Sequence, residues 1–402
     1  MRIFLSRLAS MQEIKDTGLR GIAVADTKIC AIDGEKGKLI YRGYDIQELA
    51  RYSTFEETVY LLLYETLPAR KELELYRETL ASERKLPAGI IRHLKKRKKT
   101  AHTMDVLQSV IPMLADFDIE ARTGTKLSAI KTSIKLIARM ATLVAYWDRV
   151  RKNLDIIKPD EKLGHAGNFL YMLTGNVPDA QTARDFDTCL VLHAEHSFNA
   201  STFAARVVAS TRADMYACAG AALGALSGEL HGGANTRVMK MLFEIDKIDR
   251  VEEWVKARLD AGEKIMGMGH AVYKTVDPRA LILSGISERL AERTGNAKWF
   301  ELSRKIENAV RAEFKKRKGK DIYPNVDFYS PSVYCMMGID PELFTPIFAV
   351  SRISGWCAHI LEEKFAEAQP KAVLYRPEAE YIGRYCGNEG CKYVPVGERE
   401  YA

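Results

Sequence analysis

The chain has 402 residues, of which 47% are hydrophobic and 28% are charged. This is the composition of an ordinary soluble protein, long enough for two domains and a large core. No stretch approaches the ~20 apolar residues of a membrane helix, and the formal net charge of +7 suits small anionic ligands as readily as nucleic acid. We therefore expect a cytoplasmic protein with no membrane partner.

The first predicted elements form a small hairpin. Two runs of strand-forming residues, Thr27 to Ile32 and Lys38 to Arg42, flank the turn-forming segment Asp33 to Gly37. After this hairpin, apolar residues recur with helical spacing over almost all of the chain, which predicts an all-α fold. The expected helices span 53–64, 70–82, 104–113, 126–145, 182–208, 216–227, 251–261, 278–294, 299–318 and 346–363, with a linked helix and turn at 163–178.

The basic runs and the cysteines point to no further partner or cofactor. The densest basic run, at 95–99, could be read as a nucleic-acid patch or a targeting signal, but no nucleic-acid-binding pattern accompanies it. The seven cysteines are odd in number and scattered, so a disulfide framework is not expected. Cys386 and Cys391 leave open a disulfide, a metal shared across a dimer or a plain mobile end, of which we favour the last.

Four segments each place an ionisable residue beside turn-forming residues. They are Gly228-Glu-Leu-His231-Gly-Gly-Ala-Asn235, Met266-Gly-Met-Gly-His270-Ala-Val-Tyr-Lys274 with Asp277-Pro-Arg279, Tyr323-Pro-Asn-Val-Asp327-Phe-Tyr-Ser330, and Ser351-Arg352-Ile-Ser-Gly-Trp356. Glycine beside a histidine lets backbone and substrate approach closely. One such segment could equally be a helix end, whereas four together indicate a catalytic constellation.

In the order and spacing of these motifs, the chain resembles the citrate synthase family in its short form, from about Gly18 to about Gly383. The resemblance implies a two-domain helical fold, with a large domain at 1–232 and 339–402 and a small domain at 233–338. It also implies a homodimeric acyltransferase that needs no cofactor or metal. The implied reaction condenses acetyl-CoA with oxaloacetate and water to citrate and CoA, the entry step of the tricarboxylic acid cycle.

The resemblance places the acid–base roles on His231, His270 and Asp327. Joining an acyl-CoA methyl carbon to a ketone requires a base for a weakly acidic C–H and donors for two oxygens that gain charge. Asp327 suits the base, because an aspartate in a water-poor cleft has a raised pKa. His231, held by Ser201, is expected to stabilise the enol, and His270 to hold and protonate the oxaloacetate carbonyl.

A dicarboxylate substrate calls for guanidinium groups, which bind carboxylates in bidentate geometry and stay charged. By resemblance, Arg279, Arg352 and His196 bind oxaloacetate in their own subunit, while Arg376 reaches the partner's site and makes the dimer obligatory. We expect His193 and His196 to share a face of one helix, since they are three residues apart. A metal pair there is disfavoured, because no further ligands with zinc-like spacing lie nearby.

The coenzyme's phosphates call for basic residues close to the acid–base set. Lys274 supplies one, and Lys318 and Lys320 lie in a basic run shortly ahead of Asp327. Such a run is usually a solvated face, so only its position favours contact with the coenzyme. Asn325, in the motif that carries the base, is expected at the CoA site as well.

Closure of the small domain onto the large one after oxaloacetate binds would make substrate binding ordered.

The nearest alternative function is 2-methylcitrate synthase with propionyl-CoA, because a pocket discriminates one methylene by only about 1–3 kcal/mol. A non-catalytic helical dimer that binds anions is a more distant alternative, since it has no need of Asp327 and two glycine-flanked histidines. A citrate-cleaving lyase is disfavoured because no P-loop is present.

Overall fold

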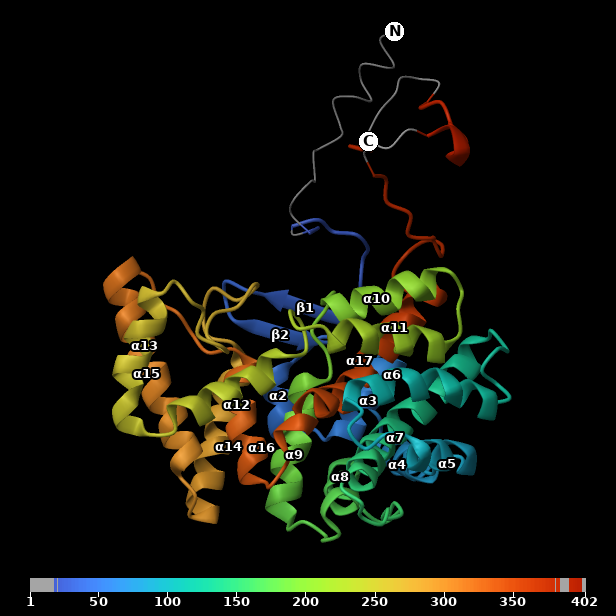
Figure 1. Cartoon of the computed structure of the whole chain (residues 1–402). Coiled ribbons are helices and arrows are strands. Elements are labelled where there is room, and N and C mark those ends of the chain that lie inside the picture. Colours follow the sequence, from blue (N-terminus) through green and yellow to red (C-terminus); the bar gives the residue numbers. More distant parts are fainter. Residues whose placement is uncertain (1–17, 20, 380, 384–389, 400–402) are drawn as a thin grey trace.

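The computed structural model describes residues 18–19, 21–379, 381–383 and 390–399. The regular elements of this part are helices, apart from one three-stranded antiparallel sheet (Figure 1). The predicted all-α fold with a small N-terminal hairpin is confirmed, and the hairpin gains a short third strand. Cys386, one of the two tail cysteines considered above, lies outside the described residues.

The sheet precedes all of the described helices. Its strands are β1 (Cys30–Asp33), β2 (Lys38–Tyr41) and β3 (Tyr44–Asp45), in the order β1-β2-β3 and with Cys30 opposite Tyr41. The first helices are α2 (Ile46–Tyr52), α3 (Phe55–Tyr64), α4 (Arg70–Ser82), α5 (Ala88–Lys96), α6 (Thr103–Met113), α7 (Lys126–Arg151), α8 (His165–Thr174) and α9 (Ala180–His193). The later helices are α10 (Ala200–Ser210), α11 (Met215–Ser227), α12 (Ala234–Ile245), α13 (Val251–Asp260), α14 (Pro278–Thr294), α15 (Lys298–Lys318), α16 (Val326–Met336) and α17 (Phe344–Lys364).

Helix α17 is the hub of the core. Almost all of its residues are buried, and it packs against α3, α7, α9, α10 and α11. A helix that is buried on every side cannot show an amphipathic stripe, and α17 accordingly contains the buried Trp356 and the buried Arg352. The motif at 351–356 therefore lies in the interior and not on a surface loop.

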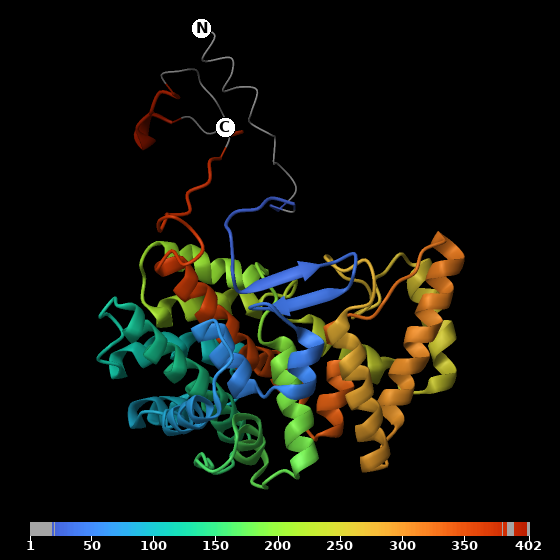
Figure 2. The same cartoon turned by 180° about the vertical axis from the view of Figure 1, so that it is seen from behind.

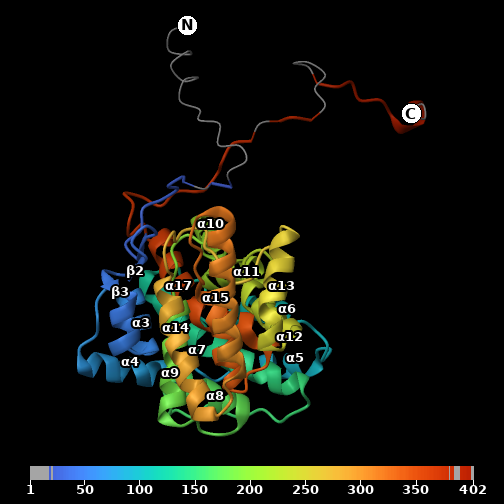
Figure 3. The same cartoon turned by 90° about the vertical axis from the view of Figure 1, so that its left-hand side faces the viewer.

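Helices α12 to α16 pack mainly on one another and form one side of the molecule (Figure 1). The reverse view in Figure 2 shows the same grouping, with the sheet at the top between this group and the remaining helices. In the side view of Figure 3 the group faces the viewer and the sheet lies at one edge. Helices α14 and α12 connect the group to α2, α9 and α17. The domain boundaries expected at 232 and 339 fall at the ends of this group and stay a prediction.

The single helix predicted at 182–208 is wrong, because the chain leaves the helix between α9 and α10. Just past the end of α9, the hydroxyl of Tyr41 donates to the carbonyl of Glu195 (2.8 Å), and Ser197 adopts a positive φ of 52°. Asn199 then caps α10 by accepting from Thr202 N (3.1 Å). His193 and His196 therefore do not share a helical face, since His193 ends α9 and His196 lies in the linker.

Periodicity also missed helices α2, α5, α12 and α16. Two of them begin at motifs that resemble turns: α12 follows the paired glycines after His231, and α16 begins after Pro324 and Asn325. Helix α16 also contains Pro331, which removes one backbone hydrogen bond and masks the helical pattern. Asp327 thus lies in the first turn of a helix.

The close packing of α17 against the α9–α10 linker gives a test of the fold. A Cβ added at Gly355 would lie 2.2 Å from Glu195 Oε2 and 2.4 Å from the Ala194 carbonyl oxygen. We expect Gly355→Ala to destabilise the protein by roughly 1–3 kcal/mol, because the backbone must shift to relieve the overlap. The control is Gly285→Ala in α14, whose Cβ would meet nothing closer than 3.7 Å.

The control should be neutral or stabilising by up to about 1 kcal/mol, since alanine favours a helix over glycine. Urea unfolding of both variants measures the difference. Equal effects of the two substitutions would contradict the packing described for α17.

Candidate active site

Three helices meet around His231, which lies just beyond the end of α11. Its Nε2 is 2.7 Å from Ser201 Oγ, and this hydroxyl also accepts a hydrogen bond from Trp356 Nε1 (3.1 Å). Gly232 is required here, because a Cβ would lie 2.0 Å from the Leu226 carbonyl oxygen. Burial, together with the nearby positive charge of Arg352, lowers the pKa of His231 to about 4. The imidazole is therefore neutral near pH 7.

His270 lies in a tight loop that follows two glycines with positive φ, Gly267 (77°) and Gly269 (83°). Its Nδ1 accepts from the backbone N–H groups of Val272 (2.9 Å) and Tyr273 (3.2 Å). Two donors at Nδ1 leave the proton of the neutral ring on Nε2. Burial lowers the pKa of His270 to about 4, so the residue presents a neutral N–H donor.

Three rings gather beside this loop. The ring centroids of His196 and His270 are 5.4 Å apart, and those of His270 and Tyr273 are 4.7 Å apart. His196 Nε2 also lies 3.3 Å from the Tyr273 hydroxyl, and burial lowers the pKa of His196 well below its usual value. Sequence reasoning gave Tyr273 no role, although its spacing of three from His270 could have pointed to it.

Two of the three arginines expected from the sequence, Arg279 and Arg352, are buried in different environments. Arg279 forms a fork with Asp277, with Nε to Oδ1 at 3.0 Å and Nη2 to Oδ2 at 2.8 Å. Burial alone lowers the pKa of Arg279, but the Asp277 carboxylate outweighs it and raises the pKa overall. Asp277 was quoted in the motif without a role, and its place two residues before Arg279 is the signal for the fork.

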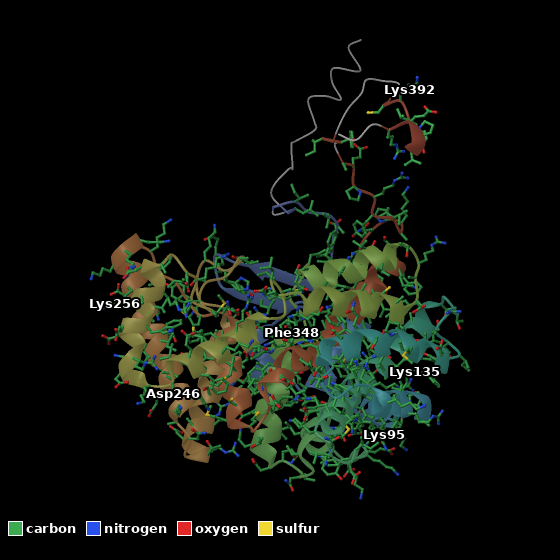
Figure 4. All side chains as sticks on the ribbon, viewed as in Figure 1. Lys95, Lys135, Asp246, Lys256, Phe348 and Lys392 are labelled. Carbon is green, nitrogen blue, oxygen red and sulfur yellow. The ribbon has the colours of Figure 1, made fainter. Side chains whose placement is uncertain are left out.

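Arg352 has no carboxylate within ion-pair distance in the described part of the chain. Its Nε donates to the His193 carbonyl oxygen (2.7 Å), and its guanidinium carbon lies 4.6 Å from the ring centroid of Phe348. Burial lowers the pKa of Arg352. Figure 4 labels Phe348 near the centre of the view. A buried guanidinium with so few partners favours binding of an anion.

The two residues before Asp327 form hydrogen bonds to the chain segments that contain His270 and Arg279. Asn325 donates from Nδ2 to the Gly269 carbonyl oxygen (2.8 Å) and accepts from Asp327 N at its Oδ1 (3.0 Å). The N–H of Val326 donates to Asp277 Oδ2 (3.2 Å). Asp327 itself is half-buried, and burial raises its pKa to about 6, although Arg279 and Arg352 act against the rise.

The remaining predicted residues are exposed and lie outside this buried group. Lys274 forms an ion pair with Glu35 in the turn of the hairpin. Lys318 and Lys320 are exposed at the end of α15. Arg376 is exposed in the segment that follows α17. The structure therefore brings together His196, Ser201, His231, His270, Arg279, Asn325, Asp327 and Arg352, and leaves the three lysines and Arg376 at the surface.

The described residues contain neither a metal-binding cluster nor a membrane-spanning helix. No group of three or more His, Cys, Asp or Glu side chains in that part of the chain is placed to hold a metal ion. None of its helices combines the length and apolar character that a membrane span requires.

The fold and the site define a helical protein in which histidine, arginine and aspartate side chains form one largely buried group, as in enzymes that use acid–base chemistry. The chain belongs to the citrate synthase family, because the family model described as "Citrate synthase, C-terminal domain" matches residues 18–378. Members of this family are enzymes that transfer an acyl group.

Individual relatives agree with the family assignment. Citrate synthase 2 of Bacillus subtilis is 45% identical over 383 residues, which cover 95% of this chain and 98% of that protein. The crystal structure of citrate synthase from Pyrobaculum aerophilum has a TM-score of 0.87 and 40% identity, with 95% of each chain covered.

A ternary complex of a Thermoplasma acidophilum citrate synthase with carboxymethyl coenzyme A and oxaloacetate has a TM-score of 0.86 and 32% identity, over 94% of this chain and 98% of that one. A relative named 2-methylcitrate synthase 1, from Corynebacterium glutamicum, is 38% identical, with 95% of this chain and 98% of that protein covered.

The raised pKa of Asp327 predicts how stability depends on pH. Below about pH 4 the carboxyl is protonated in both the folded and the unfolded state, so it contributes no difference. As the pH rises toward 6, only the unfolded state releases the proton, and the folded state loses stability. We therefore expect Asp327→Asn to be more stable than the parent above pH 6, by roughly 1–2 kcal/mol after allowance for partial exposure.

Thermal unfolding between pH 4 and pH 8 measures this difference, which should vanish toward pH 4. The control is Asp179→Asn, because hydrogen bonds from Thr182 lower the pKa of Asp179 to about 2. That variant should instead lose stability at pH 7. A destabilised Asp327→Asn protein at pH 8 would contradict the environment described for the carboxyl.

Proposed function

We propose that this chain condenses acetyl-CoA with oxaloacetate and water to form citrate and CoA, with His231, His270 and Asp327 as the catalytic residues. The observation that carries the proposal is the attachment of Asp327 to its neighbours. The pKa of the Asp327 carboxyl is raised to about 6. The two residues before it form hydrogen bonds to the loop of the neutral His270 and to Asp277, which pairs with the buried Arg279. A base, a donor and an anion site in one place suit a condensation between an acyl thioester and a keto acid.

The chemistry assigns one step to each residue. Ionised Asp327 removes a proton from the thioester methyl group, while His231 donates to the thioester oxygen. Ser201 has one hydroxyl proton, which points to Asn199 Oδ1 (2.8 Å) in the structure. For His231 to donate from Nδ1, this proton must turn to His231 Nε2 (2.7 Å), so that the imidazole proton is on Nδ1. The enol carbon then attacks the ketone carbon, and His270 Nε2–H supplies the proton for the ketone oxygen. Water finally attacks the thioester carbon: its proton restores His270 Nε2–H, and the proton held by Asp327 passes to the departing sulfur, which releases CoA as the free thiol and regenerates the ionised base.

Binding of the two substrates follows from the charges around the site. Oxaloacetate carboxylates would pair with Arg279 and Arg352 and accept a hydrogen bond from His196. In a homodimer, Arg376 completes the partner's site. The phosphates of CoA would recruit Lys274, which must then leave Glu35, together with Lys318 and Lys320. Asn325 acts in this proposal by holding the loop of His270, in addition to any contact with CoA.

The order of substrate binding would follow from the two proposed domains, which comprise residues 1–232 with 339–402 and residues 233–338. The hairpin turn contacts the loop of His270, since Lys274 N donates to the Gly34 carbonyl oxygen (3.0 Å). Closure of one domain onto the other would bring water-free surroundings to the acyl group after oxaloacetate has bound. We place the reaction in the cytoplasm, as expected from the sequence.

The test measures release of CoA thiol from purified protein with oxaloacetate and either acetyl-CoA or propionyl-CoA. We expect turnover with a higher kcat/KM for acetyl-CoA. Asp327→Asn should lower kcat by about 10²–10⁴-fold, because the general base is lost. Asp249→Asn, at an exposed aspartate beyond α12, is the matched control and should keep normal turnover.

Each other outcome has a definite meaning. A higher kcat/KM for propionyl-CoA would move the assignment to 2-methylcitrate synthase. Release of no thiol from either thioester would rule out a condensing enzyme, and turnover retained by Asp327→Asn would rule out Asp327 as the base.

A further inference from the structure

A fully buried charge cluster lies beside the proposed site. Arg206 of α10 forms ion pairs with Glu362 and Glu363 of α17, both at 2.7 Å. The cluster continues through His359, whose Nδ1 is 3.0 Å from Arg206 Nη1 and whose Nε2 is 2.9 Å from Glu195 Oε1. All five side chains are almost inaccessible to solvent. None of them was singled out by sequence reasoning, and the proposed reaction uses none of them.

The hydrogen bonds of the cluster show that negative charge is in excess. A guanidinium only donates, so His359 Nδ1 accepts from Arg206, and the ring is neutral with its proton on Nε2 facing Glu195. Within the cluster, the single positive charge of Arg206 therefore faces three carboxyl groups, one of which, Glu195, also interacts electrostatically with Arg352. Buried carboxylates in excess are costly unless further donors reach them.

Two donors come from outside the cluster. The N–H of Lys28 donates to Glu362 Oε1 (2.8 Å), and the hydroxyl of Tyr375 donates to Glu363 Oε2 (3.0 Å).

Tyr375 is also the point at which the segment after α17 is attached to the protein. Residues 371–379, here called the arm, are exposed apart from the half-buried Tyr375. Its N–H donates to Ser210 Oγ (3.3 Å), and its ring packs edge-on against Phe203 with 5.7 Å between centroids. Beyond it the chain leads away from the helices (Figure 1). The next residue along the arm is Arg376.

The opposite end of the charge cluster reaches the site of its own subunit. Glu195 immediately precedes His196, and its negative charge acts against the fall in the pKa of Arg352. One rigid group of side chains thus touches both the linker that carries His196 and the residue before Arg376.

We propose that Tyr375 is a positioning residue, which fixes the arm through the buried charge cluster so that Arg376 reaches oxaloacetate in the partner subunit's site. The inference rests on the proposed function and on its homodimer. In this proposal the charge cluster of one subunit has two roles. It supports His196 in the site of its own subunit and, through Tyr375, it supports Arg376 in the site of the partner subunit.

The first test is steady-state kinetics of Tyr375→Phe, which keeps the ring but loses the hydroxyl bond to Glu363. We expect KM for oxaloacetate to rise about tenfold, since a hydrogen bond to a charged group is lost, with kcat and KM for acetyl-CoA changed less than about twofold. Tyr216→Phe is the matched control, because it deletes a buried tyrosine bond to Asp118 (2.9 Å) away from the arm. Equal kinetic effects of both variants would overturn the proposal.

Mixed dimers decide which site Tyr375 serves. One subunit carries Asp327→Asn and the other carries Arg376→Ala, so the one complete site contains the base of the second subunit and Arg376 of the first. Tyr375→Phe placed in the first subunit should raise KM for oxaloacetate. An effect found only when the substitution is in the second subunit would overturn the proposal.

Hydrogen exchange of the parent and variant proteins gives a readout that needs no activity. Exchange of the amides in the arm should be faster in Tyr375→Phe and unchanged in Tyr216→Phe, and an unchanged arm in both would contradict the anchor. The parent enzyme is assayed first: a parent without turnover counts against the proposed function, whereas an active parent with an insensitive arm counts against Tyr375 alone.

Discussion

The buried guanidinium of Arg352 is the constraint on which the rest of the site depends. Desolvation penalises a buried charge by several kcal/mol unless it is paired or hydrogen-bonded. Among the described residues, Arg352 donates to the His193 carbonyl oxygen and lies over the Phe348 ring, but no carboxylate is within ion-pair distance. A carboxylate of the substrate would relieve that penalty. Burial is the larger cause of the lowered pKa of His231, and the same charge of Arg352 adds to it, so the cation proposed to bind the substrate also helps to keep the proposed catalytic histidine neutral.

Several elements of the fold serve to hold this charge in place. Helix α17 is buried on almost every side and carries Arg352 in its middle. The hairpin supplies Tyr41, whose hydroxyl donates to the Glu195 carbonyl oxygen in the linker that contains His196. Glu195 in that linker faces the buried charge cluster on one side and acts electrostatically on Arg352. The break between α9 and α10 therefore contains His196, whose ring lies 5.4 Å from that of His270.

The sequence allowed candidate site residues to be chosen, but it did not predict how all of them are arranged. Glycine-flanked histidines and an aspartate next to Pro324 and Asn325 are local signals, so His231, His270 and Asp327 could be selected from the chain alone. The interruption near His196 could not be predicted, because the linker there accepts a hydrogen bond from Tyr41, which is distant in sequence. Likewise, the charge cluster joins residues more than 150 positions apart, and such pairings leave no local pattern.

The helices that were missed have a related explanation. In α12 and α16 the residues that begin the helix are the ones that shape the site, so glycine, proline and asparagine appear where a helical pattern calls for other residues. Asn325 caps α16 and also holds the loop of His270. Local sequence rules fail at such positions because the site imposes its own geometry.

Thermal unfolding with and without oxaloacetate tests the role of Arg352 most directly. The parent should be stabilised by saturating oxaloacetate, whereas Arg352→Met should unfold at a higher temperature than the parent without substrate and should gain nothing from it. Arg206→Met is the contrasting variant and should be destabilised, because it leaves Glu362 and Glu363 unpaired. An Arg352→Met protein that is destabilised and still responds to oxaloacetate would contradict the central role of this buried charge.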